Sequence, residues 1–181
     1  MKGDSAIGID LEIRQRYSAI RFGVAGGVKI TVLYIGDDQT ALATGRDAEA
    51  ETILALGIGS ARTATEFFRH SPPIAGELEQ AITAVEDALL PAREIAAAGS
   101  TLFTMDAAVR AIALLGGVHD APEMVLDIEL VERIFERLAS MSAGIPAVRT
   151  GLPGSPAFAA TLLILRECMH HLRFPSITVI D

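Results

Sequence analysis

Residues Val32 to Leu42 read VLYIGDDQTAL and carry the signature of a β-hairpin. Apolar and β-branched residues stand on both sides of Gly36-Asp37-Asp38, and these three residue types favour a turn. The runs 28–35 and 39–45 are therefore predicted to pair as antiparallel strands. A third strand is predicted at 51–58, so the three strands together form an antiparallel meander.

Helical patterns dominate the rest of the chain. Upstream of the hairpin, apolar residues recur at helical spacing from Asp10 to Val24. Downstream, further strands are predicted at 93–98 and at 176–180, and a helix is predicted from Leu102 to Leu115. Asp127 and Ser155, each directly before an apolar periodic run, are predicted to be helix N-caps. This order predicts an α/β fold with a mixed sheet of about five strands and packed helices.

The composition favours one ordered domain covering residues 1–181. Half of the residues are apolar, which is enough for a substantial core, and the net charge of −8 argues against nucleic acid or an anionic membrane as the partner. One cysteine, Cys168, permits no internal disulfide bond, which is typical of a reducing compartment. The N-terminus does not resemble a signal peptide, and the longest apolar run, 157–165, is too short to span a bilayer. We therefore expect a cytoplasmic protein.

Several short motifs resemble the exopolyphosphatase/guanosine pentaphosphatase (Ppx/GppA) family. Residues 32–42 are similar to the family's phosphate loop, V-I-D-I-G-G-G-S-T-E-L. The segment around Glu12 resembles the family's E-E-A-R helix, and residues 59–62 resemble its G-A-V-R. Gly99, Ser100 and Thr101 stand where the family has a second phosphate loop, Gly-Gly-Thr. The resemblance implies a ribonuclease H-like half-domain of the actin-like ATPase kind, equivalent to the second of the family's two core domains.

The chain departs from the family where the phosphate chemistry is expected. The resemblance implies that the following residues occupy the phosphate-loop positions: Gly36, Asp37, Asp38, Gln39 and Thr40. Among them the two aspartates replace glycines, while Tyr34 and Ala41 replace the family's Asp and Glu. An anion-binding turn needs residues without Cβ so that amides can converge on phosphate. A carboxylate about 4 Å from a phosphate charge costs roughly 4 kcal/mol at an effective dielectric constant of 20. We expect weak phosphate binding.

The candidate site residues each have two interpretations. Glu12 is the candidate general base that the resemblance leaves. Asp37 and Asp38 are either a solvated turn or part of a divalent-cation site to which Glu12 or Asp10 adds oxygen ligands. Residues 99–101 are either a strand-to-helix junction, with a hydroxyl as the N-cap, or an anion site. Arg62 is either a ligand contact or one half of a surface ion pair.

Residues near the C-terminus are interpreted structurally. Cys168 lies in the most apolar predicted helix and is expected to fill the core rather than act as a nucleophile. His170 and His171 are adjacent, so they face different sides of a helix and do not both bind one metal ion. We expect them to be solvated or to cap the helix.

Three functional interpretations follow. The first is a non-catalytic Ppx/GppA-like module for binding, regulation or assembly, which needs no cofactor. The second is a phosphoric anhydride hydrolase completed by a partner domain, and only this interpretation requires Mg²⁺. The third is a domain without a present ligand. A half-domain exposes the face that the family's first domain covers, so we expect a homodimer or a partner protein on that face.

Overall fold

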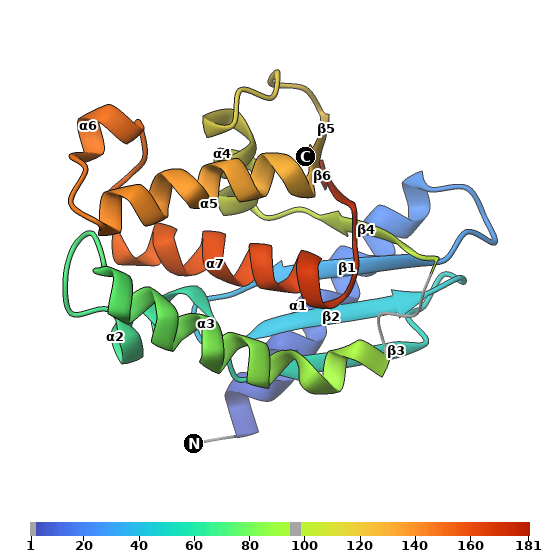
Figure 1. Ribbon diagram of the computed structural model, residues 1–181. Helices are drawn as coiled ribbons and strands as arrows, with labels where there is room; N and C mark the ends of the chain where they lie inside the picture. The colour runs from blue at the N-terminus through green and yellow to red at the C-terminus, as the bar shows by residue number, and fades with distance from the viewer. Residues whose placement is uncertain (1–2, 95–98) are drawn as a thin grey trace.

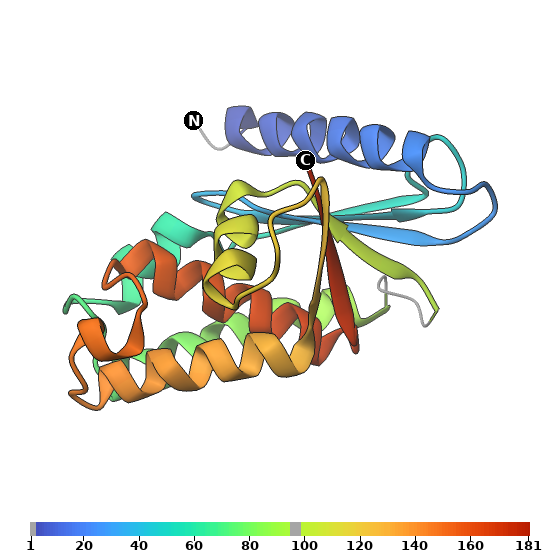
Figure 2. The same cartoon turned by 90° about the horizontal axis from the view of Figure 1, so that it is seen from above.

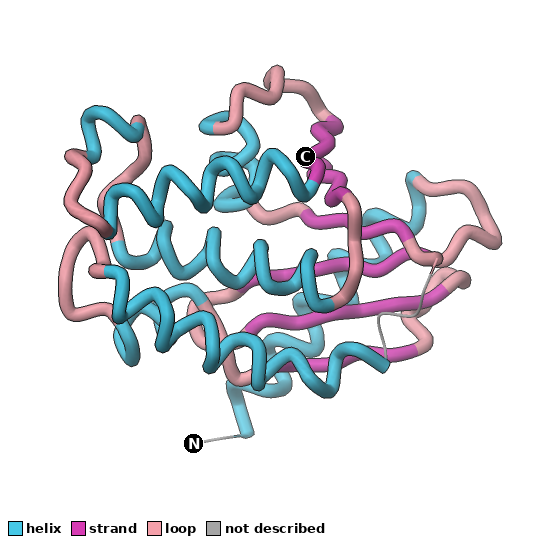
Figure 3. Tube along the Cα trace, in the orientation of Figure 1, coloured by secondary structure: helices cyan, strands magenta, loops and turns pink. Residues whose placement is uncertain are grey.

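A six-stranded mixed sheet lies at the centre of the fold, in the order β3-β2-β1-β4-β6-β5. The computed structural model describes residues 3–94 and 99–181. The strands are β1 (Ile30–Ile35), β2 (Thr40–Gly45), β3 (Thr52–Leu56), β4 (Thr101–Thr104), β5 (Glu123–Asp127) and β6 (Ser176–Ile180). Figure 1 and Figure 3 show this sheet flanked by helices. The predicted α/β fold is confirmed.

The pairing of the strands confirms the predicted meander. β1 pairs antiparallel with β2, and β2 pairs antiparallel with β3. On its other side β1 pairs parallel with β4, and β4 pairs parallel with β6. β5 closes the edge, antiparallel to β6. Since β1, β4 and β6 are parallel, they begin at one end of the sheet, and the β1–β2 hairpin lies at the other end.

The helices form two unequal layers. α1 (Gly3–Gly23) covers one face of the sheet alone, and the other helices lie on the opposite face (Figure 2). These are α2 (Ser60–Phe67), α3 (Ala75–Leu89), the 3₁₀ helix η1 (Leu90–Glu94), α4 (Ala107–Leu115), α5 (Ile128–Ser142), α6 (Ala147–Thr150) and α7 (Pro156–His171). In the described part of the chain, no helix is long and apolar enough to cross a membrane.

The alternation of side chains along β1 divides the core between the two layers. Ile30 and Val32 face α1, where they pack against a stripe that includes Ile13 and Tyr17. Leu33, on the other face, belongs to the larger core around α7. Most of α7 is buried, which explains its nearly continuous apolar sequence.

Several local predictions hold in the structure. Cys168 is buried, as expected for a residue that fills the core. Asp127 caps α5, because its carboxylate accepts the amide of Leu130 at 2.6 Å. Ser155 caps α7 by accepting the amide of Phe158 at 3.3 Å.

The prediction for residues 93–98 was wrong where the structure describes them. Residues Leu90–Glu94 form a 3₁₀ helix that continues α3, and 95–98 lie outside the described residues. The strand instead begins at Thr101, so the helix predicted from Leu102 begins only at Ala107. Propensity alone did not separate a short buried strand from a helix in this apolar segment.

The sheet also has one strand more than was predicted. β5 alternates exposed and buried residues along Glu123–Asp127, the pattern of an edge strand with one covered face. This strand is only five residues long, and its last residue, Asp127, is also the N-cap of α5. The sequence therefore gave only a weak signal for it.

Candidate functional site

The loop between β1 and β2 forms one wall of an open pocket of about 280 Å³. The structure brings the predicted loop residues 36–39 together with Glu12 of α1, whereas Thr40 begins β2, is buried and does not line the pocket. The lining residues are Gly8, Ile9, Glu12, Tyr34, Gly36, Asp37, Asp38 and Gln39. This pocket is the candidate site, because its position matches the expected phosphate loop.

The backbone of the hairpin lacks the left-handed residue of one common form of anion nest. The Gly36 amide donates to the carbonyl of Gln39 at 2.9 Å, so it closes the turn internally. No residue of 36–39, all of them described, has a positive φ angle. One form of nest alternates right-handed and left-handed residues, so that successive N–H groups point toward one site. The hairpin has no left-handed residue for this form, and the Gly36 amide is already bonded to the protein.

The N-terminus of α2 docks onto the carbonyl side of the hairpin. The Ser60 amide donates to the Gly36 carbonyl at 2.9 Å, and the Arg62 amide donates to the Asp37 carbonyl at 2.9 Å. This approach requires Gly59, because a Cβ there would lie 2.4 Å from the Asp37 carbonyl oxygen. Helix N-termini attract anions through free amides. Here the amides of Ser60 and Arg62 are already bonded to the protein.

Arg16 joins α1 to the pocket wall. Its Nε donates to Glu12 Oε1 at 2.8 Å, one helical turn away. Its Nη1 donates to Asp106 Oδ1 at 2.9 Å. Its guanidinium carbon lies 4.2 Å above the centre of the Tyr34 ring, a cation–π contact. Glu12, the candidate general base, is therefore held in an ion pair with Arg16.

Asp106 is a buried carboxylate that the sequence analysis did not select. It lies between β4 and α4 with only 6% of its surface exposed. Its Oδ2 accepts the amide of Ile35 at 2.8 Å, directly before the hairpin. Burial raises the pKa of Asp106 to about 6, against the opposing effects of the Ile35 hydrogen bond and the Arg16 charge. An Asp after a short β-rich run and before an apolar helix was the signal available in the sequence.

The pocket is acidic. Three carboxylates, Glu12, Asp37 and Asp38, line it, and no Lys or Arg is among its lining residues. Both hairpin aspartates are exposed, and Ser60 Oγ donates to Asp37 Oδ1 at 3.3 Å. This arrangement agrees with a solvated turn. Asp10 is also exposed and is not among the lining residues.

The predicted second phosphate loop does not join this pocket. Gly99 and Ser100 directly precede β4, and Thr101, its first residue, pairs with Ile30 at the start of β1. They therefore lie at the end of the sheet opposite the hairpin. The interpretation as a strand-to-helix junction was also wrong, since a strand follows. The Ser100 hydroxyl lies 2.8 Å from the Thr31 hydroxyl.

Arg62 forms the surface ion pair that was the alternative to a ligand contact. Its Nε donates to Glu66 at 2.9 Å, four residues along α2. About half of each side chain is exposed. Pairs of this kind stabilise a helix weakly and do not require a ligand.

The two adjacent histidines at the end of α7 face different partners, as the helix geometry predicts. His170 pairs with Glu132 of α5 through Nε2. His171 lies between Glu86 of α3 and Glu167 of α7. Both lie in the last turn of α7 and His170 is exposed, as expected, but each also pairs with a carboxylate, which was not predicted. The spacing of Glu167 and His171, four residues apart on one helix, was the missed signal.

Comparison with known proteins finds solved structures with a similar fold. No protein-family model and no curated protein sequence matches the chain. The solved structure of the Aquifex aeolicus PPX-GPPA enzyme is similar, with a TM-score of 0.75 and 17% sequence identity over 92% of this chain. An exopolyphosphatase from Cytophaga hutchinsonii has a TM-score of 0.71 and 14% identity, also over 92% of this chain.

The similarity is confined to part of those proteins. The chain spans 57% of the length of both. An exopolyphosphatase-like protein, with a TM-score of 0.63, shows the same relation, since the match covers 49% of its length. This agrees with a chain that corresponds to their C-terminal half alone.

Proposed function

We propose that this chain, which has the fold of one half of the Ppx/GppA exopolyphosphatases, is a non-catalytic module of that fold. It acts by binding, in regulation or in assembly, rather than by hydrolysing phosphoric anhydrides. The observation that carries the proposal is the hairpin backbone, which has no left-handed residue at 36–39. Without such a residue, the loop cannot gather its amides in an αR-αL nest around a transferring phosphoryl group.

The charges of the pocket support the same proposal. Phosphoryl transfer requires cations that neutralise the phosphate oxygens. The lining residues instead supply carboxylates at Glu12, Asp37 and Asp38. Arg16, the cation paired with Glu12, is bonded to both Glu12 and Asp106. A phosphate group would therefore meet repulsion without a compensating cation.

The contact through which the module acts is proposed to be another protein chain, first of all a second copy. In the described part of the chain, α1 is the single helix on its face of the sheet (Figure 2), and it exposes two large apolar side chains. Leu11 is 57% exposed and Phe22 is 97% exposed. Apolar side chains projecting from one helix are typical of an interaction surface. A cytoplasmic location completes the proposal, supported by the one cysteine, Cys168, which is free and buried.

The experiment is a titration with inorganic tripolyphosphate, with and without Mg²⁺, by calorimetry. The unmodified chain is expected to give no saturable binding in the millimolar range. The double variant Asp37→Gly, Asp38→Gly removes two carboxylates and permits left-handed backbone there, so it is expected to gain measurable binding. A matched control changes two exposed carboxylates elsewhere, Glu123→Gly and Glu129→Gly, and is expected to gain none. Saturable binding to the unmodified chain, strengthened by Mg²⁺, supports the alternative of a phosphatase completed by a partner.

A further inference from the structure

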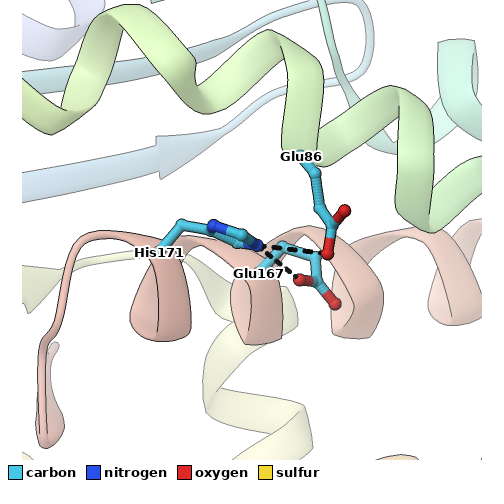
Figure 4. A group of neighbouring side chains, drawn as sticks. All are labelled: Glu86, Glu167 and His171. Atoms are coloured by element: carbon cyan, nitrogen blue, oxygen red, sulfur yellow. Dashed lines mark hydrogen bonds and ion pairs between the residues drawn. The ribbon is translucent and has the colours of Figure 1, made fainter.

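A second cluster of polar side chains lies away from the hairpin pocket, where α3 packs against α7. His171 ends α7 and is followed shortly by β6, so it lies at the end of the sheet where the parallel strands begin. Figure 4 shows its ring pointing between the carboxylates of Glu86 and Glu167. Among the described residues, this is the one group of three His, Cys, Asp or Glu ligand atoms that lie within 4.8 Å of one another.

We propose that Glu86, Glu167 and His171 bind a divalent transition-metal ion of the Zn²⁺ type. His171 Nε2 and one carboxylate oxygen from each glutamate are the three ligand atoms. Imidazole nitrogen with carboxylate oxygen is a donor set that suits Zn²⁺, whereas Mg²⁺ and Ca²⁺ prefer oxygen ligands alone. The site is separate from the proposed function of the hairpin pocket and does not depend on it.

The distances also fit a shared ion. His171 Nε2 lies 3.2 Å from Glu86 Oε1 and 3.4 Å from Glu167 Oε2. Charge-assisted N–H···O bonds are shorter, about 2.7–2.9 Å. Zinc–ligand distances of about 2.0–2.2 Å place neighbouring ligand atoms of a tetrahedral site about 3.4 Å apart. One nitrogen thus faces two carboxylates at the spacing of a zinc site.

The burial of Glu167 is the second observation. Its side chain is only 2% exposed. One oxygen accepts from Arg166, and the partner of the other is the imidazole at 3.4 Å. A bound cation would stabilise the ionised form of this carboxylate.

Helix geometry preforms the site and leaves it accessible. Glu167 and His171 are four residues apart and share one face of α7. Glu86 comes from the adjacent helix α3, and its side chain is 43% exposed. The exposed side gives the ion a path of entry and leaves a fourth position for water. The ion would connect α3 to α7.

One cation competes with the metal ion. Arg93 Nη2 lies 2.6 Å from His171 Nδ1, on the ring nitrogen opposite the two carboxylates. A ring that binds metal through Nε2 carries its proton on Nδ1, so the arginine donor must leave. Arg93 is exposed and can turn toward solvent. Removal of Arg93 is therefore expected to strengthen metal binding.

Calorimetric titration of the full chain with Zn²⁺ at pH 7.5 tests the proposal. We expect one Zn²⁺ per chain and no comparable binding of Mg²⁺. Glu86→Gln and His171→Ala are each expected to weaken binding at least tenfold. The control His170→Ala removes the adjacent imidazole, which pairs with Glu132, and is expected to bind like the unmodified chain. Circular dichroism checks that each variant is folded.

Two results would contradict the proposed metal site. One is the absence of stoichiometric Zn²⁺ binding, and the other is binding that Glu86→Gln leaves unchanged. If His171→Ala does not fold, Glu86→Gln decides the test, because that side chain is partly exposed. Arg93→Ala is expected to tighten Zn²⁺ binding severalfold, while Arg133→Ala, the loss of an exposed arginine on α5, is not. If the three side chains form only ion pairs and bind no metal, Arg93→Ala will not increase the affinity for Zn²⁺.

Discussion

Arg16 and Asp106 lie 90 positions apart in the sequence and form an ion pair of 2.9 Å between α1 and the start of α4. The pair lies beside the hairpin, because Asp106 also accepts the Ile35 amide. Asp106 is 6% exposed and the Arg16 side chain 21%. Among the described residues, the one helix on this face of the sheet is thus fixed beside the hairpin that resembles the phosphate loop.

Replacing Arg16 with Ala should destabilise the fold strongly at neutral pH. It leaves the buried Asp106 carboxylate without its cation, and the loss of one partner of a buried pair costs about 3 kcal/mol. Chemical denaturation at pH 7.5 measures the change in the free energy of unfolding. Arg14→Ala, an exposed arginine on the same helix, is the control and should change it by less than about 0.5 kcal/mol. Equal effects of the two variants would show that the ion pair does not fix α1.

Asp106 should also make stability depend on pH. Its pKa is raised to about 6 from 3.8, so the folded state binds a proton that the unfolded state has released between these values. Stability should therefore fall as pH rises from 4 to 7, by about 3 kcal/mol from this group. Asp106→Asn cannot ionise and should remove this fall. The measurement is the difference in the free energy of unfolding between the two proteins across that range. A constant difference would contradict the raised pKa.

Gly59→Ala should separate α2 from the hairpin. The added Cβ would lie 2.4 Å from the Asp37 carbonyl oxygen. Because this oxygen belongs to the backbone, it cannot turn away as a flexible side chain could. The strain should lower the free energy of unfolding by about 1–3 kcal/mol. Gly76→Ala is the matched control, since nothing lies within 4 Å of its Cβ, and it should be neutral or stabilising in α3. Thermal melting of both variants gives the comparison.

Cys168 should resist thiol reagents in the folded protein. Burial raises the pKa of this thiol to about 12, so little thiolate forms near neutral pH. Reaction with a chromogenic disulfide at pH 8 should be at least roughly a hundredfold slower than in denaturant. A fast reaction of the folded chain would show that α7 is more accessible than its packing indicates.

The sequence predicted the meander and the faces of the main helices well, because each has a local signal. Gly36-Asp37-Asp38 marked the hairpin, and Ser155 marked the start of α7. The prediction was wrong at Thr101–Thr104, because this strand forms by pairing with β1, which no local pattern encodes. Because of that error, Gly99 to Thr101 was expected to follow a strand, whereas these residues lie where β4 begins, at the end of the sheet opposite the hairpin.

The sequence predicted several residues of the candidate pocket, but it did not predict the long-range contacts around them. Glu12 and the hairpin aspartates do meet at one pocket. Asp106 was missed because it joins the site only through the order of the strands. The Glu86, Glu167 and His171 cluster was missed because Glu86 comes from another helix. Long-range pairs of this kind become visible only when the tertiary structure is known.

The central proposal is that the hairpin pocket does not catalyse phosphoric anhydride hydrolysis. Phosphate release from polyphosphate, guanosine pentaphosphate and ATP, each with and without Mg²⁺, tests it most directly. The account predicts release at the rate of the protein-free control, because the loop has no left-handed residue for an αR-αL nest and its carboxylates repel the substrate. Mg²⁺-dependent turnover by the unmodified chain, lost in Glu12→Gln, would contradict it.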